Sequence, residues 1–234
     1  MTNTLHRFSE HYAFEPNPDA RPVEDDFIVF AMATKNVNDD QLVDKYRTFA
    51  RLALTHNPVN VGDATKGGIW RPQPALNPLA HWKRDERPDP DRLVEDIEGH
   101  TVMAAVFSRW DDMRGFVEDL ARADLGLSVN ISAPIDAAAR CCKASGLTRH
   151  SVEYSLGFQG RIERLPDRAV LEISTMCGHG MVSHNFVKKM VDWVKEGRRT
   201  PGQAARYMAR FCICGVFNTV RAETLFEKAR KGGY

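Results

Sequence analysis

Cysteine and histidine residues gather near the end of the chain. They occur as Cys177-Gly178-His179, then His184, then Cys212-Ile213-Cys214. Thiolate and imidazole groups bind soft metal ions, and neighbouring glycines allow the backbone to turn tightly around a bound group. We therefore expect a metal centre whose ligands are Cys177, His179, Cys212 and Cys214.

The cysteine spacing favours an iron–sulfur cluster as the first choice of cofactor and zinc as the second. Zinc knuckles usually separate their cysteines by about two to four residues, whereas a single residue lies between Cys212 and Cys214. Ligation of a cluster permits more varied spacing. Three cysteines on a 4Fe–4S cluster would leave one iron open to substrate, which predicts a lyase, hydrolase or oxidoreductase acting on a small polar molecule.

Two other functions would use the same residues differently. Cys177 precedes a predicted helix, and a helix N-terminus lowers the pKa of a nearby thiol. It would then be the nucleophile of a metal-free thiol enzyme, with His179 or His184 as its base. Alternatively, cysteine is a common core residue, and the chain would be a non-catalytic binding or assembly module. For Cys141 and Cys142, which are adjacent on a predicted helix, we expect burial of one rather than ligation.

Composition narrows the classes of partner. The 234 residues include 32 Lys and Arg against 31 Asp and Glu, and 43% are hydrophobic. This balance is typical of a globular protein and creates no strong field for nucleic acid or anionic lipid. We expect a small-molecule partner, no nucleic acid and no membrane, while self-association stays open. The densest group of cations is expected on a solvated helix face: Lys188, Lys189, Lys195, Arg198 and Arg199.

Cysteine usage and the N-terminal segment predict a cytoplasmic protein. The first residues are polar and contain no apolar stretch of signal-peptide length. The five cysteines are an odd number, which argues against a disulfide framework and for free or metal-bound thiols.

Hydrophobic periodicity and turn residues predict the elements that carry these side chains. Strands are expected at 27–32, 101–107, 127–131, 152–158 and 169–175, the last two as a hairpin. Helices are expected from an Asn38/Gln41 capping box to residue 54, after Asp89-Pro90, at 110–123, 134–145, 181–197 and 201–210, and from 218 onward. Residues 56–90 are expected to be a long irregular loop.

These elements predict an α+β fold, a ferredoxin-like sandwich of strands and helices with a C-terminal helical cap. Residues 1–98 would form a strand, a helix and the long loop, 99–176 an α+β core, and 177–234 the helical region with the metal site, together one compact unit. Two antiparallel helices would bring the turn at Cys212 and Cys214 back to Cys177.

Three weaker candidates rest on other segments. Glu153 and Glu172 would make an acid/base pair if they lie opposite each other on the hairpin. Gly67-Gly68, flanked by cations, would wrap an anionic substrate. A polar sheet face would line a substrate pocket: Ser128, Asn130, Ser132, Ser155 and Ser174.

Overall fold

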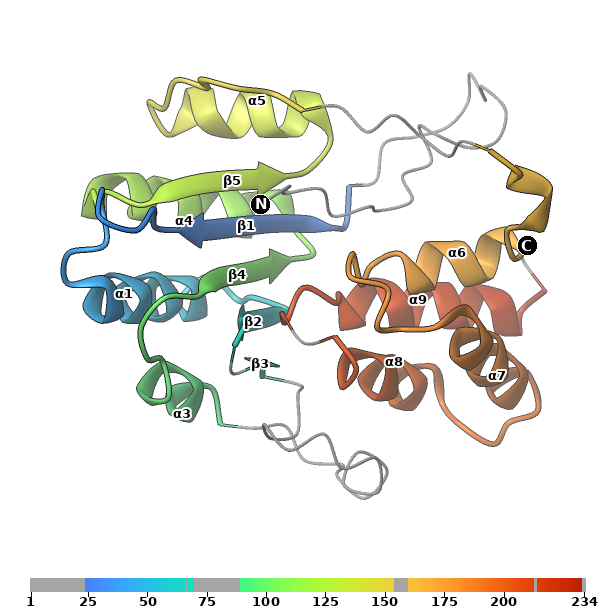
Figure 1. Cartoon of the computed structure of the whole chain (residues 1–234). Coiled ribbons are helices and arrows are strands. Elements are labelled where there is room, and N and C mark those ends of the chain that lie inside the picture. Colours follow the sequence, from blue (N-terminus) through green and yellow to red (C-terminus); the bar gives the residue numbers. More distant parts are fainter. Residues whose placement is uncertain (1–23, 66, 70–88, 154–159, 213, 233–234) are drawn as a thin grey trace.

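The fold is a mixed α and β structure built on one antiparallel sheet (Figure 1). The computed structural model describes residues 24–65, 67–69, 89–153, 160–212 and 214–232. Among them are eight α-helices and five strands in the order β3-β2-β4-β1-β5. The strands are β1 (Phe27–Met32), β2 (Asn60–Asp63), β3 (Gly67–Gly68), β4 (Val102–Phe107) and β5 (Ser128–Ser132).

The interior strand β1 is buried on both faces. It pairs with β4 on one side, where Phe27 lies opposite Phe107, and with β5 on the other, where Ile28 lies opposite Ser132. Helices cover both faces of the sheet, which explains why β1 is a continuous hydrophobic run rather than an alternating one.

Four helices cover one face and form the first layer. They are α1 (Leu42–Leu54), α3 (Pro90–Glu95), α4 (Trp110–Ala123) and α5 (Ile135–Ala144). Their core is rich in aromatic side chains, and the rings of Phe49 and Phe116 meet edge to face with centroids 5.1 Å apart.

The other four helices form the second layer, grouped together at the right of Figure 1. They are α6 (Arg168–Ser174), α7 (His184–Lys195), α8 (Pro201–Ala209) and α9 (Thr219–Arg230). One hydrophobic cluster joins them to the opposite face of the sheet through Ile28, Phe30, Ala104 and Val106. The C-terminal helices therefore cap the sheet face that the first layer leaves open.

Local signals located several elements correctly. The structure confirms β1, α4 and the strand at β4, within a residue or so of the predicted bounds. A complete capping box begins α8, because Thr200 Oγ1 accepts from Gln203 N and Gln203 Oε1 accepts from Thr200 N. Asn218 caps α9 as expected. Within the described part of the chain, no helix has the length and apolar character needed to cross a bilayer.

Three predictions were wrong. The expected strand at 169–175 is helix α6, in which all six residues from Ala169 to Ser174 are buried, so that its hydrophobic run resembles a buried strand. The Asn38/Gln41 capping box does not form, because Gln41 is left-handed with φ 49° and Asn38 Oδ1 accepts from Thr34 N instead. The expected loop at 56–90 contains β2 and β3. Most of the expected strand at 152–158 lies outside the described residues.

Candidate metal centre

Two tight turns of the second layer carry the candidate ligands. One turn follows α6, where Gly180 N donates to Cys177 O over 2.9 Å, and the other follows α8, where Gly215 N donates to Cys212 O over 3.4 Å. Gly180 and Gly215 have φ of 67° and 68°. Glycine adopts this left-handed conformation without steric cost, so both turns depend on it.

The turns bring the four predicted ligands together. The thiols of Cys177 and Cys212 share a hydrogen bond. Cys212 Sγ lies 4.0 Å from Cys214 Sγ, and Cys214 Sγ lies 3.5 Å from His179 Nδ1. These groups form a continuous chain of contacts from Cys177 to His179.

Burial differs between the thiols and the imidazole. Cys177, Cys212 and Cys214 are 2%, 1% and 5% exposed. His179 is exposed. The sulfurs thus lie beneath the surface, whereas His179, which contacts Cys214, reaches the solvent.

Backbone hydrogen bonds favour the thiolate form of each sulfur, although other contacts outweigh them at Cys177 and Cys212. Met181 and Val182 provide backbone hydrogen bonds to Cys177, and Val216 provides them to both Cys212 and Cys214. Each of these hydrogen bonds lowers the pKa of the thiol that receives it. Hydrogen bonds to sulfur also tune metal-bound thiolates.

The thiols ionise in an order set by their contacts. The hydrogen bond with Cys212 and burial raise the pKa of Cys177. For Cys212, the hydrogen bond with Cys177 lowers the pKa, but the hydrogen bond with Cys214 and burial outweigh it and raise the value to about 12. The hydrogen bond with Cys212 lowers the pKa of Cys214 despite burial. Without a metal, Cys214 is therefore the first thiolate to form, beside His179.

The structure does not support activation of Cys177 by a helix terminus. Cys177 follows helix α6, and α7 begins only at His184, beyond the turn at Gly180. His184 is exposed at the first position of α7, and it makes no hydrogen bond to a thiol among the described residues. The structure therefore brings His179, rather than His184, to the sulfurs.

The sheet edge supports the second turn through direct backbone contact. A Cβ atom added to Gly62 of β2 would lie 2.2 Å from Cys214 O, and one added to Gly68 of β3 would lie 2.6 Å from Gly215 Cα. Asn60 Nδ2 donates to Phe217 O over 3.3 Å, just beyond the turn. Sequence reasoning missed this support, although the Gly67-Gly68 pair was a visible signal.

The remaining sequence candidates contribute no side chain to this centre. Cys141 is buried in the first layer, on the opposite face of the sheet, and Cys142 is half-buried. Glu172 lies in α6 and bonds to Arg168, so the predicted hairpin pair with Glu153 does not form. Gly67 and Gly68 belong to β3 rather than to an anion-binding loop.

The polar sheet face that the sequence predicts as the lining of a substrate pocket is found only in part. Ser132 and Asn130 lie opposite Ile28 and Phe30, which belong to the second-layer cluster. Ser174 is buried in α6 and donates to Leu171 O. Ser155 lies outside the described residues.

In the part of the chain that the structure describes, no group of three or more Cys, His, Asp or Glu side chains already encloses a position for a metal ion. Each of these groups contacts only the next one, in the order Cys177, Cys212, Cys214 and His179. Ligation would therefore require the four side chains to move toward one common point. No protein-family model, no curated protein and no solved structure matches the chain.

Proposed function

We propose that this protein binds a soft metal through Cys177, Cys212, Cys214 and His179. The observation that carries the proposal is the meeting of two turns far apart in sequence, each supplying thiols that accept backbone hydrogen bonds. Such a combination is typical of sites that hold thiolates.

The separations of the donor atoms favour a single tetrahedral ion. With Zn–S bonds of about 2.3 Å and Zn–N bonds of about 2.0–2.1 Å, tetrahedral angles separate two sulfurs by about 3.8 Å and sulfur from nitrogen by about 3.6 Å. The corresponding distances here are 4.0 Å between Cys212 and Cys214 and 3.5 Å between Cys214 and His179. These two separations are close to those of a tetrahedral zinc site.

An iron–sulfur cluster is the second form of this proposal, although the spacing in the sequence favoured it first. In a 4Fe–4S cluster each thiolate binds a different iron. The three sulfurs would have to move apart to admit the cluster. We accordingly rank zinc ahead of the cluster.

The exposed imidazole suggests that the centre is catalytic. Three buried thiolates would hold the metal, while His179 occupies the side that faces solvent. With all four ligands bound the site would be closed, whereas a catalytic metal site keeps one position for water or substrate, so catalysis would require the exposed His179 to give up its position. A metal there supplies Lewis-acid chemistry, which fits a lyase, hydrolase or oxidoreductase acting on a small polar substrate.

We also infer that the sheet and the first layer form a ferredoxin-like sandwich. The order β1-α1-β2-β4-α4-β5 and the sheet order β2-β4-β1-β5 agree with the β-α-β-β-α-β motif. Strand β3 extends one edge, and α6 to α9 form the cap. This likeness concerns architecture, and the proposed function depends on the centre.

A metal-free thiol enzyme is the second candidate function. The lowered pKa of Cys214 and its contact with His179 Nδ1 favour this reading, with Cys214 rather than Cys177 as the nucleophile. All five cysteines are free, so either function suits the reducing cytoplasm that the sequence predicts.

Metal analysis of anaerobically purified protein tests the proposal. Zinc, iron and sulfide content and visible absorption would be measured for the wild type, Cys212→Ser and Cys214→Ser, with Cys141→Ser as the matched control from the first layer. We expect stoichiometric zinc, or iron with sulfide, that is lost in the first two variants and kept in the control. A folded wild type that stays metal-free after reconstitution with zinc or with iron and sulfide would overturn the metal proposal and favour the thiol enzyme.

A further inference from the structure

A cavity lies between α6, α7 and α9. Its volume is about 670 Å³, within the range of about 300–1,000 Å³ that is usual for small-molecule sites. Small residues leave the space open, because Ala169, Ala229 and Gly232 line it where larger side chains would fill it. Val170 and Val191 complete an apolar floor.

Cations dominate the lining of this cavity. Its lining includes only two carboxylates, those of Asp167 and Asp192, but four cationic side chains: Arg168, Lys188, Lys195 and Lys228. Arg168 is partly neutralised by its ion pair with Glu172 at 2.7 Å. An excess of positive charge over an apolar floor favours an anionic ligand with an apolar body.

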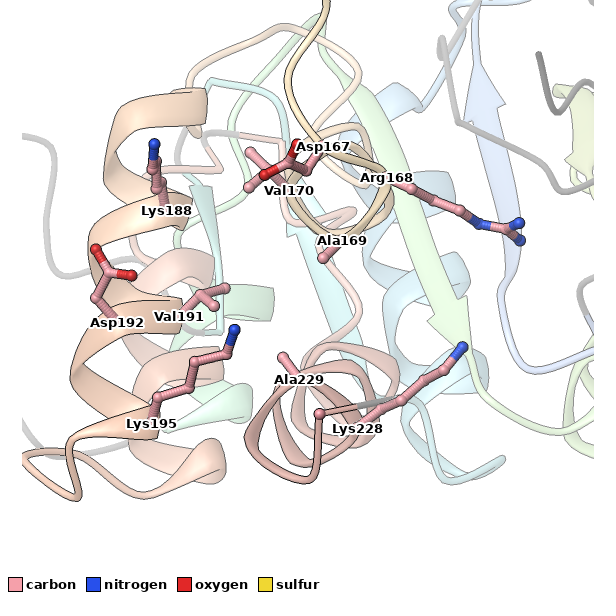
Figure 2. Close-up of a pocket in the computed structure, with 11 residues that line it drawn as sticks. Asp167, Arg168, Ala169, Val170, Lys188, Val191, Asp192, Lys195, Lys228 and Ala229 are labelled. Carbon is pink, nitrogen blue, oxygen red and sulfur yellow. The ribbon is translucent and has the colours of Figure 1, made fainter. Parts of the chain in front are cut away.

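Lys195 is the cation that reaches furthest into the space. Figure 2 shows it extending from the last turn of α7 toward the gap between α7 and α9, whereas Arg168 and Lys228 extend on the side away from α7. Among the described residues, Lys195 forms no ion pair. Its ammonium group is therefore available to bind an anionic group, with the other cations adding to the local field.

We propose that this cavity binds a small organic anion. The phosphate or carboxylate of the ligand contacts Lys195, and its apolar body packs on Val170, Val191 and Ala229. The site is separate from the proposed metal centre, because it lies toward the Asp167 end of α6 and the Lys195 end of α7. The segment that joins the opposite ends of these helices carries Cys177 and His179. The inference does not depend on the metal proposal.

Titration calorimetry with phenyl phosphate at low ionic strength tests this inference on the full chain. The variants are Lys195→Ala and the matched control Lys189→Ala, which removes an exposed α7 cation that lies over Trp193 rather than in the cavity. Loss of one charge-assisted contact should weaken binding about tenfold in Lys195→Ala. The control should stay within about twofold of the wild type. Thermal unfolding of each variant checks that the helices remain folded.

Two further probes separate a built site from general charge attraction. Inorganic phosphate should bind several-fold more weakly than phenyl phosphate, because it lacks an apolar body. Ala169→Leu, which fills the cavity, should weaken the binding of phenyl phosphate and leave the metal content of the protein unchanged. The inference is wrong if the wild type shows no saturable binding at millimolar phenyl phosphate, or if the two lysine variants lose affinity equally.

Discussion

The two faces of the sheet each bury a cysteine, but they surround the sulfur differently. In the first layer Cys141 is enclosed mainly by apolar side chains, and burial raises its pKa to about 11. In the second layer the pKa of Cys214 is lowered, although Cys214 is also buried, because of its hydrogen bond with Cys212 and the backbone hydrogen bonds to its sulfur. Burial by itself makes a thiol inert, and only donors arranged around it make it a ligand or nucleophile.

The largest effect is expected where the sheet edge meets the second turn. Gly62→Val should place its Cβ against Cys214 O and displace the turn, so that the metal content falls to background and stability falls by about 2–4 kcal/mol. Urea unfolding and metal analysis measure both effects. The matched change Gly202→Ala in α8 meets only the flexible side chain of Glu223 and should retain the metal. Full metal content in Gly62→Val would show that the sheet edge does not position the turn.

The comparison of the two cysteines can be tested directly by alkylation. In metal-free protein at neutral pH, Cys214, with its pKa below the ordinary 9.0, should hold at least about 100-fold more thiolate than Cys141, whose pKa is about 11. Peptide mapping after limited treatment with iodoacetamide should therefore find Cys214 modified before Cys141. Equal labelling of the two residues, or preferential labelling of Cys177, would contradict the ionisation order.

A smaller effect is expected from alkaline pH on metal-free protein. The folded-state pKa values of Cys141 and Cys212, about 11 and about 12, exceed the ordinary 9.0. The folded state therefore binds these two protons more tightly than the unfolded state does. The free energy of unfolding should fall as pH rises from about 9 through these values. Cys214 acts in the opposite direction, since its lowered pKa adds stability as pH rises toward 9. Urea midpoints measured with a chelator should fall less steeply above pH 9 in Cys141→Ala than in the wild type.

The smallest effect concerns one helix cap in each layer. Thr200→Ala and Asp89→Ala should each cost about 1 kcal/mol, because each removes a side-chain acceptor at a helix N-terminus. Only Thr200→Ala should also weaken metal affinity, since α8 leads to Cys212. Competition with a chromophoric chelator measures the affinity. Equal weakening by both changes would indicate a general loss of stability instead.

The sequence predicted what local chemistry determines and missed what packing determines. The helix hairpin of α7 and α8 and the capping box at Thr200 were visible in residue spacing, and they bring Cys212 and Cys214 back to Cys177. Helix α6 was missed because six consecutive buried residues, Ala169 to Ser174, leave no alternation of polar and apolar positions to reveal the helical period. The contact of Gly62 with Cys214 joins distant parts of the chain, and no local pattern encodes it.

That same backbone contact has a consequence for biogenesis. Gly62 leaves the ribosome long before Cys214, and contacts of such long sequence separation form late because the intervening loop must close first. Strand β2 and its partner β4 therefore both leave the ribosome before the turn that β2 supports. The proposed metal centre would be completed only when this contact forms, so we expect any metal uptake to follow folding of the second layer.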